Sequence, residues 1–168
     1  AAYEIVLEAQ KKAIKTSQAG KTLDDVHRTA CMVLIRGLMD LKCLVGLSES
    51  DHFKRKTYTA FYPHRTGHYL GLDVHDAGEY YDRNDKPVPL EEGVLTTVEP
   101  GLYFQDQILL PGASEEEKDK LKRYIRLPAR LRGTGIRIED NVLITGKGPL
   151  NLSWSIPKEL ADIEALKN

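Results

Sequence analysis

The sequence predicts an α+β fold in which helices cover one face of a mostly antiparallel sheet. Apolar residues recur at helical spacing from residue 3 to residue 41, and short strand-like segments separated by Gly and Pro appear only after residue 62. Helices grouped ahead of strands favour α+β over an alternating parallel sheet. With 168 residues, 41% of them hydrophobic and 29% charged, the chain suits one globular domain.

The first expected helix runs from about residue 3 to residue 17. Its buried side is formed by small and aliphatic residues at helical spacing: Ile5, Val6, Ala9 and Ala13. Lysines occupy the other side, and Ala19-Gly20 follows the helix, because glycine readily takes the conformation that closes helices.

The second expected helix begins at Thr22 and continues to about Leu41. Asp25 lies three residues after Thr22, a spacing that resembles a capping box. The same region contains Gly20-Lys21-Thr22, which looks like the end of a phosphate-binding loop. That loop needs an earlier glycine where Lys15 stands, so we interpret the segment as a helix boundary.

The remaining chain is expected to alternate loops with strands. Residues 48–59 are polar and read as a loop, and strands are expected at residues 69–72, 94–98, 136–138 and 141–145. The highly charged residues 115–132 are expected to form a solvated insertion or long hairpin. The alternative for this stretch is an oligomer contact or a substrate-gating element.

The composition of the chain gives evidence about its partners and its compartment. The formal net charge of −1 gives no reason to expect nucleic acid or membrane partners, and no apolar run is long enough to span a bilayer. Cys31 and Cys43 lie in an apolar helical segment and are expected to be reduced core residues, which fits a cytoplasmic location. The chain opens on a helix without a cap or a signal sequence, as the interior of a longer protein would.

One short stretch carries the strongest chemical signal. It holds three histidines, His64, His68 and His75, with glycines between them. Imidazole suits both metal ligation and proton transfer near neutral pH, and glycine lets the backbone approach a ligand closely. The stretch therefore indicates a functional site.

The histidine spacing adds a structural condition. His68 and His75 are an odd number of residues apart, so on a regular strand they would face opposite sides. They can share a site only if the chain bends near Gly71, and the alternative is that one of them is structural. His27 and His52 are isolated in the sequence, and we interpret them as structural or surface residues.

Two glutamates complete the candidate set. Glu99 ends an apolar strand before a Pro-Gly turn, and Glu139 lies next to β-branched residues. A carboxylate buried among such residues needs a cation. Arg137, two residues away on the same strand face, is the alternative partner for Glu139 alone. Taken together, His68, Glu99 and Glu139 favour a metal.

Residues 64–76, 97–101 and 135–140 resemble the three C-terminal signature segments of the aminopeptidase P and prolidase family, in matching order. The resemblance covers the whole chain. It implies that residues 1–168 are the C-terminal part of a pita-bread catalytic domain, which is half of that fold.

The resemblance also implies a site for two divalent metals, usually manganese, with cobalt or zinc as alternatives. His68 matches the histidine ligand, Glu99 the first glutamate ligand, which also helps to activate water, and Glu139 the bridging glutamate. The two aspartate ligands of the family would precede the first helix and have no match in this sequence. The chain by itself is therefore expected to lack a complete metal site.

The remaining roles are also implied by the resemblance. His64 matches a histidine near the prolyl part of the substrate, His75 the histidine at the scissile bond, and Arg137 an arginine that supports the ligand carboxylates. The implied reaction is hydrolysis of the bond before a proline in second position of a peptide. The alternatives are an Xaa-Pro dipeptidase and a non-catalytic module that binds peptides or proteins. We expect a homo-oligomer, because half of the fold would leave a sheet edge uncovered.

Overall fold

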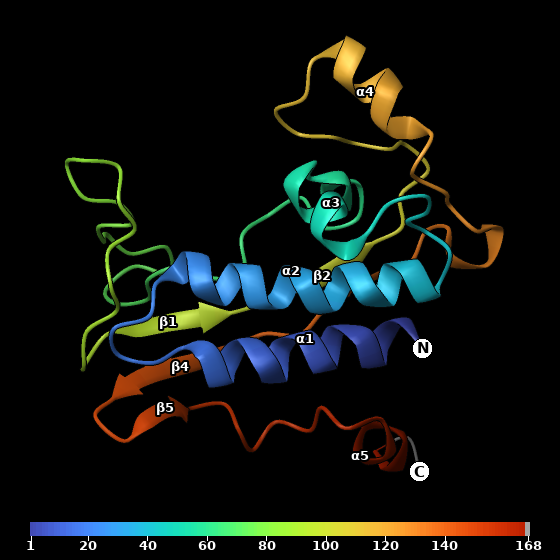
Figure 1. Cartoon of the computed structure of the whole chain (residues 1–168). Coiled ribbons are helices and arrows are strands. Elements are labelled where there is room, and N and C mark those ends of the chain that lie inside the picture. Colours follow the sequence, from blue (N-terminus) through green and yellow to red (C-terminus); the bar gives the residue numbers. More distant parts are fainter. Residues whose placement is uncertain (167–168) are drawn as a thin grey trace.

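The computed structural model describes residues 1–166 as helices packed on two small antiparallel sheets, which confirms the predicted fold class (Figure 1). The helical elements are α1 (Ala2–Thr16), α2 (Leu23–Asp40), α3 (Glu49–Lys54), η1 (Thr57–Ala60), α4 (Glu115–Lys122), η2 (Ala129–Leu131) and α5 (Leu160–Ala165). The strands are β1 (Leu95–Val98), β2 (Gly101–Tyr103), β3 (Gly135–Arg137), β4 (Asp140–Thr145) and β5 (Gly148–Asn151).

Helices α1 and α2 lie side by side as an antiparallel pair over the sheets (Figure 1). The predicted capping box is present: the Asp25 amide donates to the Thr22 hydroxyl at 3.1 Å, and the Thr22 amide donates to the Asp25 carboxylate at 3.0 Å. These bonds satisfy amide groups that have no partner inside the helix. The Gly20-Lys21-Thr22 segment is therefore a helix boundary, as predicted.

The strand pairing sets the position of the two glutamates. β1 pairs with β4, β4 with β5, and β2 with β3, all antiparallel, with Val98 opposite Asp140 and Gly101 opposite Arg137. Glu99 lies in the link from β1 to β2, and Glu139 lies in the link from β3 to β4. Because these links join the same two pairs of strands, they run next to each other and bring the glutamates together.

The apolar core lies between the helices and the sheets. Its larger part surrounds α2 and includes Leu34, Leu38, Tyr62 and Phe104, all buried. A smaller part joins α1 and α2 to β1 and β4. Each fully buried side chain of this size contributes roughly 1.5–3 kcal/mol relative to exposure, so this core fixes how the strands sit under the helices.

Two local predictions were wrong. Residues 69–72 form no strand: Tyr69 makes one bridge to Thr96, and the chain then turns, leaving Leu72 fully exposed. Residues 48–59 contain α3 and η1 rather than a loop. Ser48 caps α3 by accepting a bond from the Asp51 amide at 3.1 Å, and contact with α2 buries His52. Local capping and tertiary burial together outweigh the polar composition.

The charged stretch 115–132 is only partly solvated: it contains a solvated helix, α4, but Ile125 is buried in the core. None of the residues of α4 is buried, and the helix stands away from the body of the molecule (Figure 1). A capping box between Ser114 and Glu117 supports it, as do ion pairs between side chains three or four residues apart.

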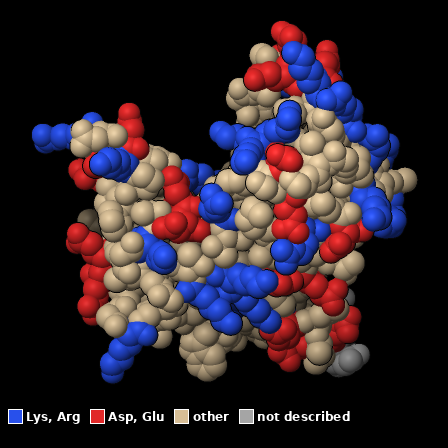
Figure 2. Space-filling model, viewed as in Figure 1, with Lys and Arg blue, Asp and Glu red and all other residues tan. Residues whose placement is uncertain are grey.

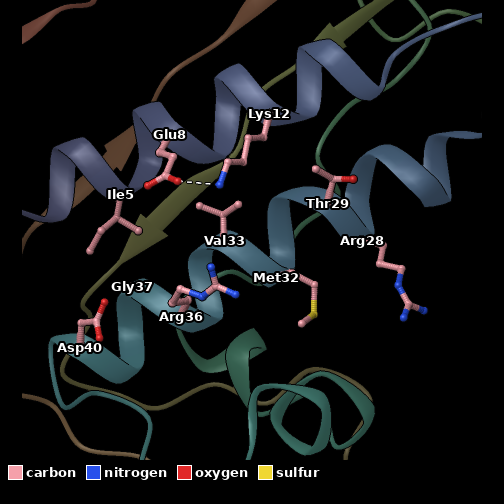
Figure 3. Close-up of a pocket in the computed structure, with 10 residues that line it drawn as sticks. All are labelled: Ile5, Glu8, Lys12, Arg28, Thr29, Met32, Val33, Arg36, Gly37 and Asp40. Carbon is pink, nitrogen blue, oxygen red and sulfur yellow. Dashed lines mark ion pairs between the residues drawn. The ribbon is translucent and has the colours of Figure 1, made fainter.

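Basic side chains gather over the outer helical face (Figure 2). A groove of about 410 Å³ lies there between α1 and α2, and its walls include Lys12, Arg28 and Arg36. Glu8 and Lys12 form an ion pair of 2.7 Å across one turn of α1 (Figure 3). None of the residues predicted for the metal site lines this groove. Among residues 1–166, no helix is both long and apolar enough to cross a membrane.

Candidate metal centre

The structure brings the three predicted ligands together. One ligand atom from each of His68, Glu99 and Glu139 lies within 4.8 Å of the other two. His68 and Glu99 are largely buried, with side chains 16% and 11% exposed, whereas Glu139 is exposed. The cluster combines one imidazole with two carboxylates, which suits manganese, cobalt or zinc.

The loop that carries His68 is anchored to β1 by backbone bonds. The Thr97 amide donates to the His68 carbonyl at 2.9 Å, and the His68 amide donates to the Thr97 hydroxyl at 3.1 Å. A side chain at Gly67 would collide with the Thr97 carbonyl, so only glycine allows this approach.

The imidazole of His68 is oriented for ligation. Its Nδ1 lies 2.8 Å from the carbonyl of Tyr69, to which a protonated Nδ1 donates. That tautomer leaves a lone pair on Nε2, which lies 3.4 Å from Glu99 Oε1. Histidine ligands are commonly oriented through their second nitrogen in this way.

Glu99 is held from several directions. Its amide donates to the Thr66 carbonyl at 2.6 Å, and its carboxylate accepts a bond from the Thr97 hydroxyl at 3.3 Å. The Arg137 guanidinium lies 3.6 Å from Glu99 Oε2. Among the described residues, Arg137 therefore pairs with Glu99, and no ion pair joins it to Glu139. The pairing proposed as an alternative explanation for Glu139 is wrong.

The chain bends between His68 and His75, as a shared site requires. Their rings meet edge to face, with centroids 4.3 Å apart. The Gly71 amide donates to the Asp73 carbonyl at 3.2 Å, and the Asp76 amide donates back to the Tyr69 carbonyl at 3.1 Å. This turn reverses the chain, so the two histidines reach the same side.

His64 belongs to a second cluster at the edge of the site. Its Nε2 lies 2.9 Å from the hydroxyl of Tyr103, and Arg137 Nε donates to the same hydroxyl at 2.6 Å. Burial, together with the nearby Arg137 charge, lowers the pKa of His64 below its ordinary value. Its Nδ1 lies 2.8 Å from the Arg65 carbonyl, to which a protonated Nδ1 donates, so Nε2 is the acceptor for the Tyr103 hydroxyl.

Sequence reasoning did not include Tyr103 in the site. The residue joins His64 to Arg137, and its position follows from the pairing of β2 with β3, in which Tyr103 lies opposite Gly135. The only signal in the sequence is an aromatic residue in a short strand that follows Glu99.

Asp140 is a second residue whose environment the sequence did not reveal. It directly follows Glu139, is 1% exposed, and contacts the Gln10 amide group and the Lys158 ammonium, the latter at 3.0 Å from Oδ1. Oδ1 makes no hydrogen bond within the described chain, so the contact with Lys158 is its main compensation. The strand that follows Glu139 is thereby tied to α1 and to the C-terminal segment.

Two of the three candidate ligands, His68 and Glu99, line an open hollow of about 400 Å³. Its lining residues are His64, Arg65, Gly67, His68, His75, Tyr80, Glu99 and Arg137. A hollow with histidines, a carboxylate and a guanidinium on its walls has the polar groups expected of a hydrolytic site.

Comparisons with known proteins show the family and the fold. Residues 1–146 match the model of metallopeptidase family M24, and the chain belongs to that family. Its fold is the pita-bread fold of aminopeptidase P.

Particular relatives can be named. The chain is similar to an Xaa-Pro aminopeptidase of Haemophilus influenzae, at 39% identity over 99% of this chain and 34% of the relative. The structure of the Pseudomonas aeruginosa aminopeptidase PepP superposes with a TM-score of 0.81 at 36% identity, over 98% of this chain and 33% of that one. Aminopeptidase P of Escherichia coli, solved with the inhibitor Pro-Leu, superposes with a TM-score of 0.79 at 33% identity, over 98% of this chain and 33% of that one. The chain thus spans about a third of the length of these relatives.

Proposed function

We propose that this chain contributes three metal ligands, His68, Glu99 and Glu139, to an enzyme that hydrolyses the peptide bond before proline, as an Xaa-Pro aminopeptidase does. The observation that carries the proposal is the convergence of these three side chains, from separate segments, within 4.8 Å. A non-catalytic descendant would have no need to keep one imidazole and two carboxylates at this distance, because closely spaced carboxylates repel each other without a cation.

The donor set fits divalent metals. One neutral imidazole nitrogen and two carboxylates suit manganese, cobalt or zinc, and we propose manganese. A related Escherichia coli aminopeptidase P has been solved in a zinc-substituted form. When bound, such ions polarise the substrate carbonyl and lower the pKa of water.

The side chains around the proposed metals can each have a separate role in hydrolysis. Glu99, partly buried and beside His68, is placed to accept a proton from the attacking water. His75 lies against His68 and can donate a hydrogen bond to the oxygen on which negative charge develops. His64 lies farther along the hollow and can contact the prolyl part of the peptide, while Arg137 orients the Glu99 carboxylate.

The complete site needs more ligands than the cluster provides. We propose that residues 1–168 form the C-terminal part of a catalytic domain, and that two aspartates from outside this sequence complete the two-metal site. Within residues 1–166, the metal-type cluster contains only His68, Glu99 and Glu139. Asp25 is used as a helix cap, and Asp24 pairs with Arg65, so both already have structural partners.

We further propose a homo-oligomer and a cytoplasmic setting. β5 is an edge strand, and the exposed residues Leu150, Leu152 and Trp154 alternate along it and its continuation, so a second copy could cover them. Both cysteines are buried and unpaired, as is usual in a reducing compartment.

Activity against two peptide classes tests the proposal. The protein that carries this chain, with the upstream aspartates present, is assayed with manganese on Xaa-Pro dipeptides and on longer peptides with proline in second position. Release of the first residue from the longer peptides supports the aminopeptidase. Cleavage of dipeptides alone would instead identify a dipeptidase, and no cleavage of either class, despite bound metal, would favour a binding module.

A further inference from the structure

A buried polar network lies behind the candidate metal site and outside its set of ligands. Thr66 is 1% exposed, and its hydroxyl lies 2.9 Å from His27 Nδ1 and 2.6 Å from the Tyr62 hydroxyl. His27 comes from α2, and its other nitrogen lies 3.4 Å from the sulfur of Cys31. Side chains from α2 and from residues 62–66 therefore meet at a single threonine hydroxyl.

The network can be fully hydrogen-bonded only with a neutral histidine. Burial, with the nearby Arg65 charge, lowers the pKa of His27 to about 4. A neutral imidazole can accept from Thr66 at Nδ1 and donate toward Cys31 at Nε2, while Thr66 accepts from Tyr62. Buried networks in which every member has a partner rigidify their surroundings.

The threonine is connected to the ligands on both sides. Thr66 lies between His64 and His68 in the chain, and its carbonyl accepts the 2.6 Å bond from the Glu99 amide. The Tyr62 ring also packs edge to face on His64 at 4.8 Å. Any shift of Thr66 would therefore displace His68 and Glu99 together.

We propose that Thr66, held by His27 and Tyr62, is a positioning residue that fixes the spacing of His68 and Glu99 for metal binding. The inference rests on the proposed metal site and adds a role for three residues that do not touch the metal. Outer residues that orient ligands change metal affinity by about 10–100-fold when removed.

The chain contains a matched control for the test. His52 and Thr57 form another buried histidine–threonine pair, with Nδ1 and the hydroxyl 2.7 Å apart, both side chains 0% exposed. This pair lies in α3 and η1 and does not line the hollow. Thr57→Val therefore makes the same chemical change as Thr66→Val at a similar depth, away from the ligands.

The experiment uses the protein that carries this chain together with the upstream aspartates. It measures the Zn²⁺ dissociation constant of that protein and of its variants by competition with a chelating indicator. The titration extends to millimolar zinc, and circular dichroism confirms that each protein is folded. We expect Thr66→Val to weaken binding by about 10–100-fold, whereas Thr66→Ser, which keeps the hydroxyl, and Thr57→Val stay within about threefold of the wild type. Tyr62→Phe replaces Thr66→Val if the latter does not fold.

The outcomes separate the two proposals. Wild-type affinity in folded Thr66→Val overturns the positioning role and leaves the metal site intact. An equal loss in Thr57→Val also overturns it, because general loosening would then explain the effect. A folded wild type that binds no zinc overturns the proposed metal site, and the positioning role with it.

Discussion

At the scale of single residues, the site depends on how differently its two glutamates are held. The largely buried Glu99 carboxylate accepts a bond from the Thr97 hydroxyl and pairs with Arg137, and the Glu99 amide donates to the Thr66 carbonyl. Glu139, by contrast, is exposed. An exposed carboxylate with few protein partners is free to reach a second ion, as a bridging ligand must. Arg137, by contrast, contacts Glu99, Tyr103 and His64.

Replacing Glu139 should therefore affect metal binding more than replacing Arg137. We expect Glu139→Ala to weaken metal binding by more than about 100-fold, because a ligand is lost, and Arg137→Ala to weaken it by about tenfold, because only an outer contact is lost. Isothermal titration calorimetry of both variants in the protein with the complete site measures this, and turnover should follow the same order. Near-normal turnover in Glu139→Ala would contradict the ligand assignment.

His27 should make stability depend on pH. Its pKa falls from 6.5 to about 4 in the folded chain, mainly through burial. Between these values the unfolded chain binds more protons, so stability is fully present above about pH 6.5 and is lost as pH falls toward 4. The loss is on the order of 3 kcal/mol for this group.

The variant His27→Gln isolates this contribution. Urea unfolding at several pH values between about 7 and 4.5 should show a shallower decline in the free energy of unfolding for the variant than for the wild type. Parallel curves for the two proteins would show that His27 is not the titrating group.

At the scale of elements, the link from β1 to β2 and the link from β3 to β4 bring Glu99 and Glu139 together. Buried contacts hold these two links in place. Asp140 begins β4 directly after Glu139, faces Val98 on β1, and is tied to the C-terminal segment by Lys158. Lys158 also donates to the Ser153 and Ile156 carbonyls. It therefore joins residues within its own segment and also ties that segment to Asp140.

Lys158→Met should be strongly destabilising. It leaves the Asp140 carboxylate buried without its cation, which typically costs about 3–5 kcal/mol. The control is Lys11→Met, which removes the exposed pair between Lys11 and Glu159 that joins the same C-terminal segment to α1, and it should cost about 0–1 kcal/mol. Thermal and urea unfolding measure both.

A second substitution identifies the cause of that loss. Adding Asp140→Asn to Lys158→Met removes the unpaired charge and should restore part of the stability. A double variant no more stable than Lys158→Met would show that packing of the lysine stem, rather than the buried charge, explains the effect.

Gly67 should be intolerant of any side chain. A Cβ there would overlap the Thr97 carbonyl, which is backbone and cannot move aside without shifting β1. We expect Gly67→Ala to cost about 1–3 kcal/mol and to weaken metal binding. Gly146→Ala is the comparison, because its Cβ would meet only the flexible Glu92 carboxylate, at 3.0 Å. Equal stability of the two variants would contradict the close approach.

At the scale of the whole molecule, the chain presents two of the three proposed ligands, His68 and Glu99, on the wall of an open hollow, with Glu139 close to them. Affinity for a divalent ion falls with the number and charge of its ligands, and the two-metal arrangement that activates water needs more of them. We expect the purified chain to bind manganese weakly and to show no substantial turnover of an Xaa-Pro peptide.

Two measurements on the purified chain check this expectation. Metal analysis after dialysis should find less than two ions per chain, and added manganese should not produce appreciable cleavage. Two bound ions with strong turnover would show that the three ligands suffice or that a second copy supplies the others, which sedimentation velocity would distinguish.

The sequence by itself determined the residue types and the local structure. The two amphipathic helices, the Thr22 capping box and three of the four expected strands were predicted, because they depend on periodicity and capping, which act over a few residues. The three signature segments also indicated the family, which the comparisons show.

Only the tertiary structure decided which partners hold the site residues in place. α3 forms in a polar segment because contact with α2 buries His52, and Tyr103, Thr66, His27 and Asp140 acquire their roles from strand pairing and helix packing. Most of these partners lie far apart in the sequence. Local sequence patterns do not predict contacts between residues so widely separated. The sequence gives the chemistry of each side chain, but the packing of the core decides which other side chain it contacts.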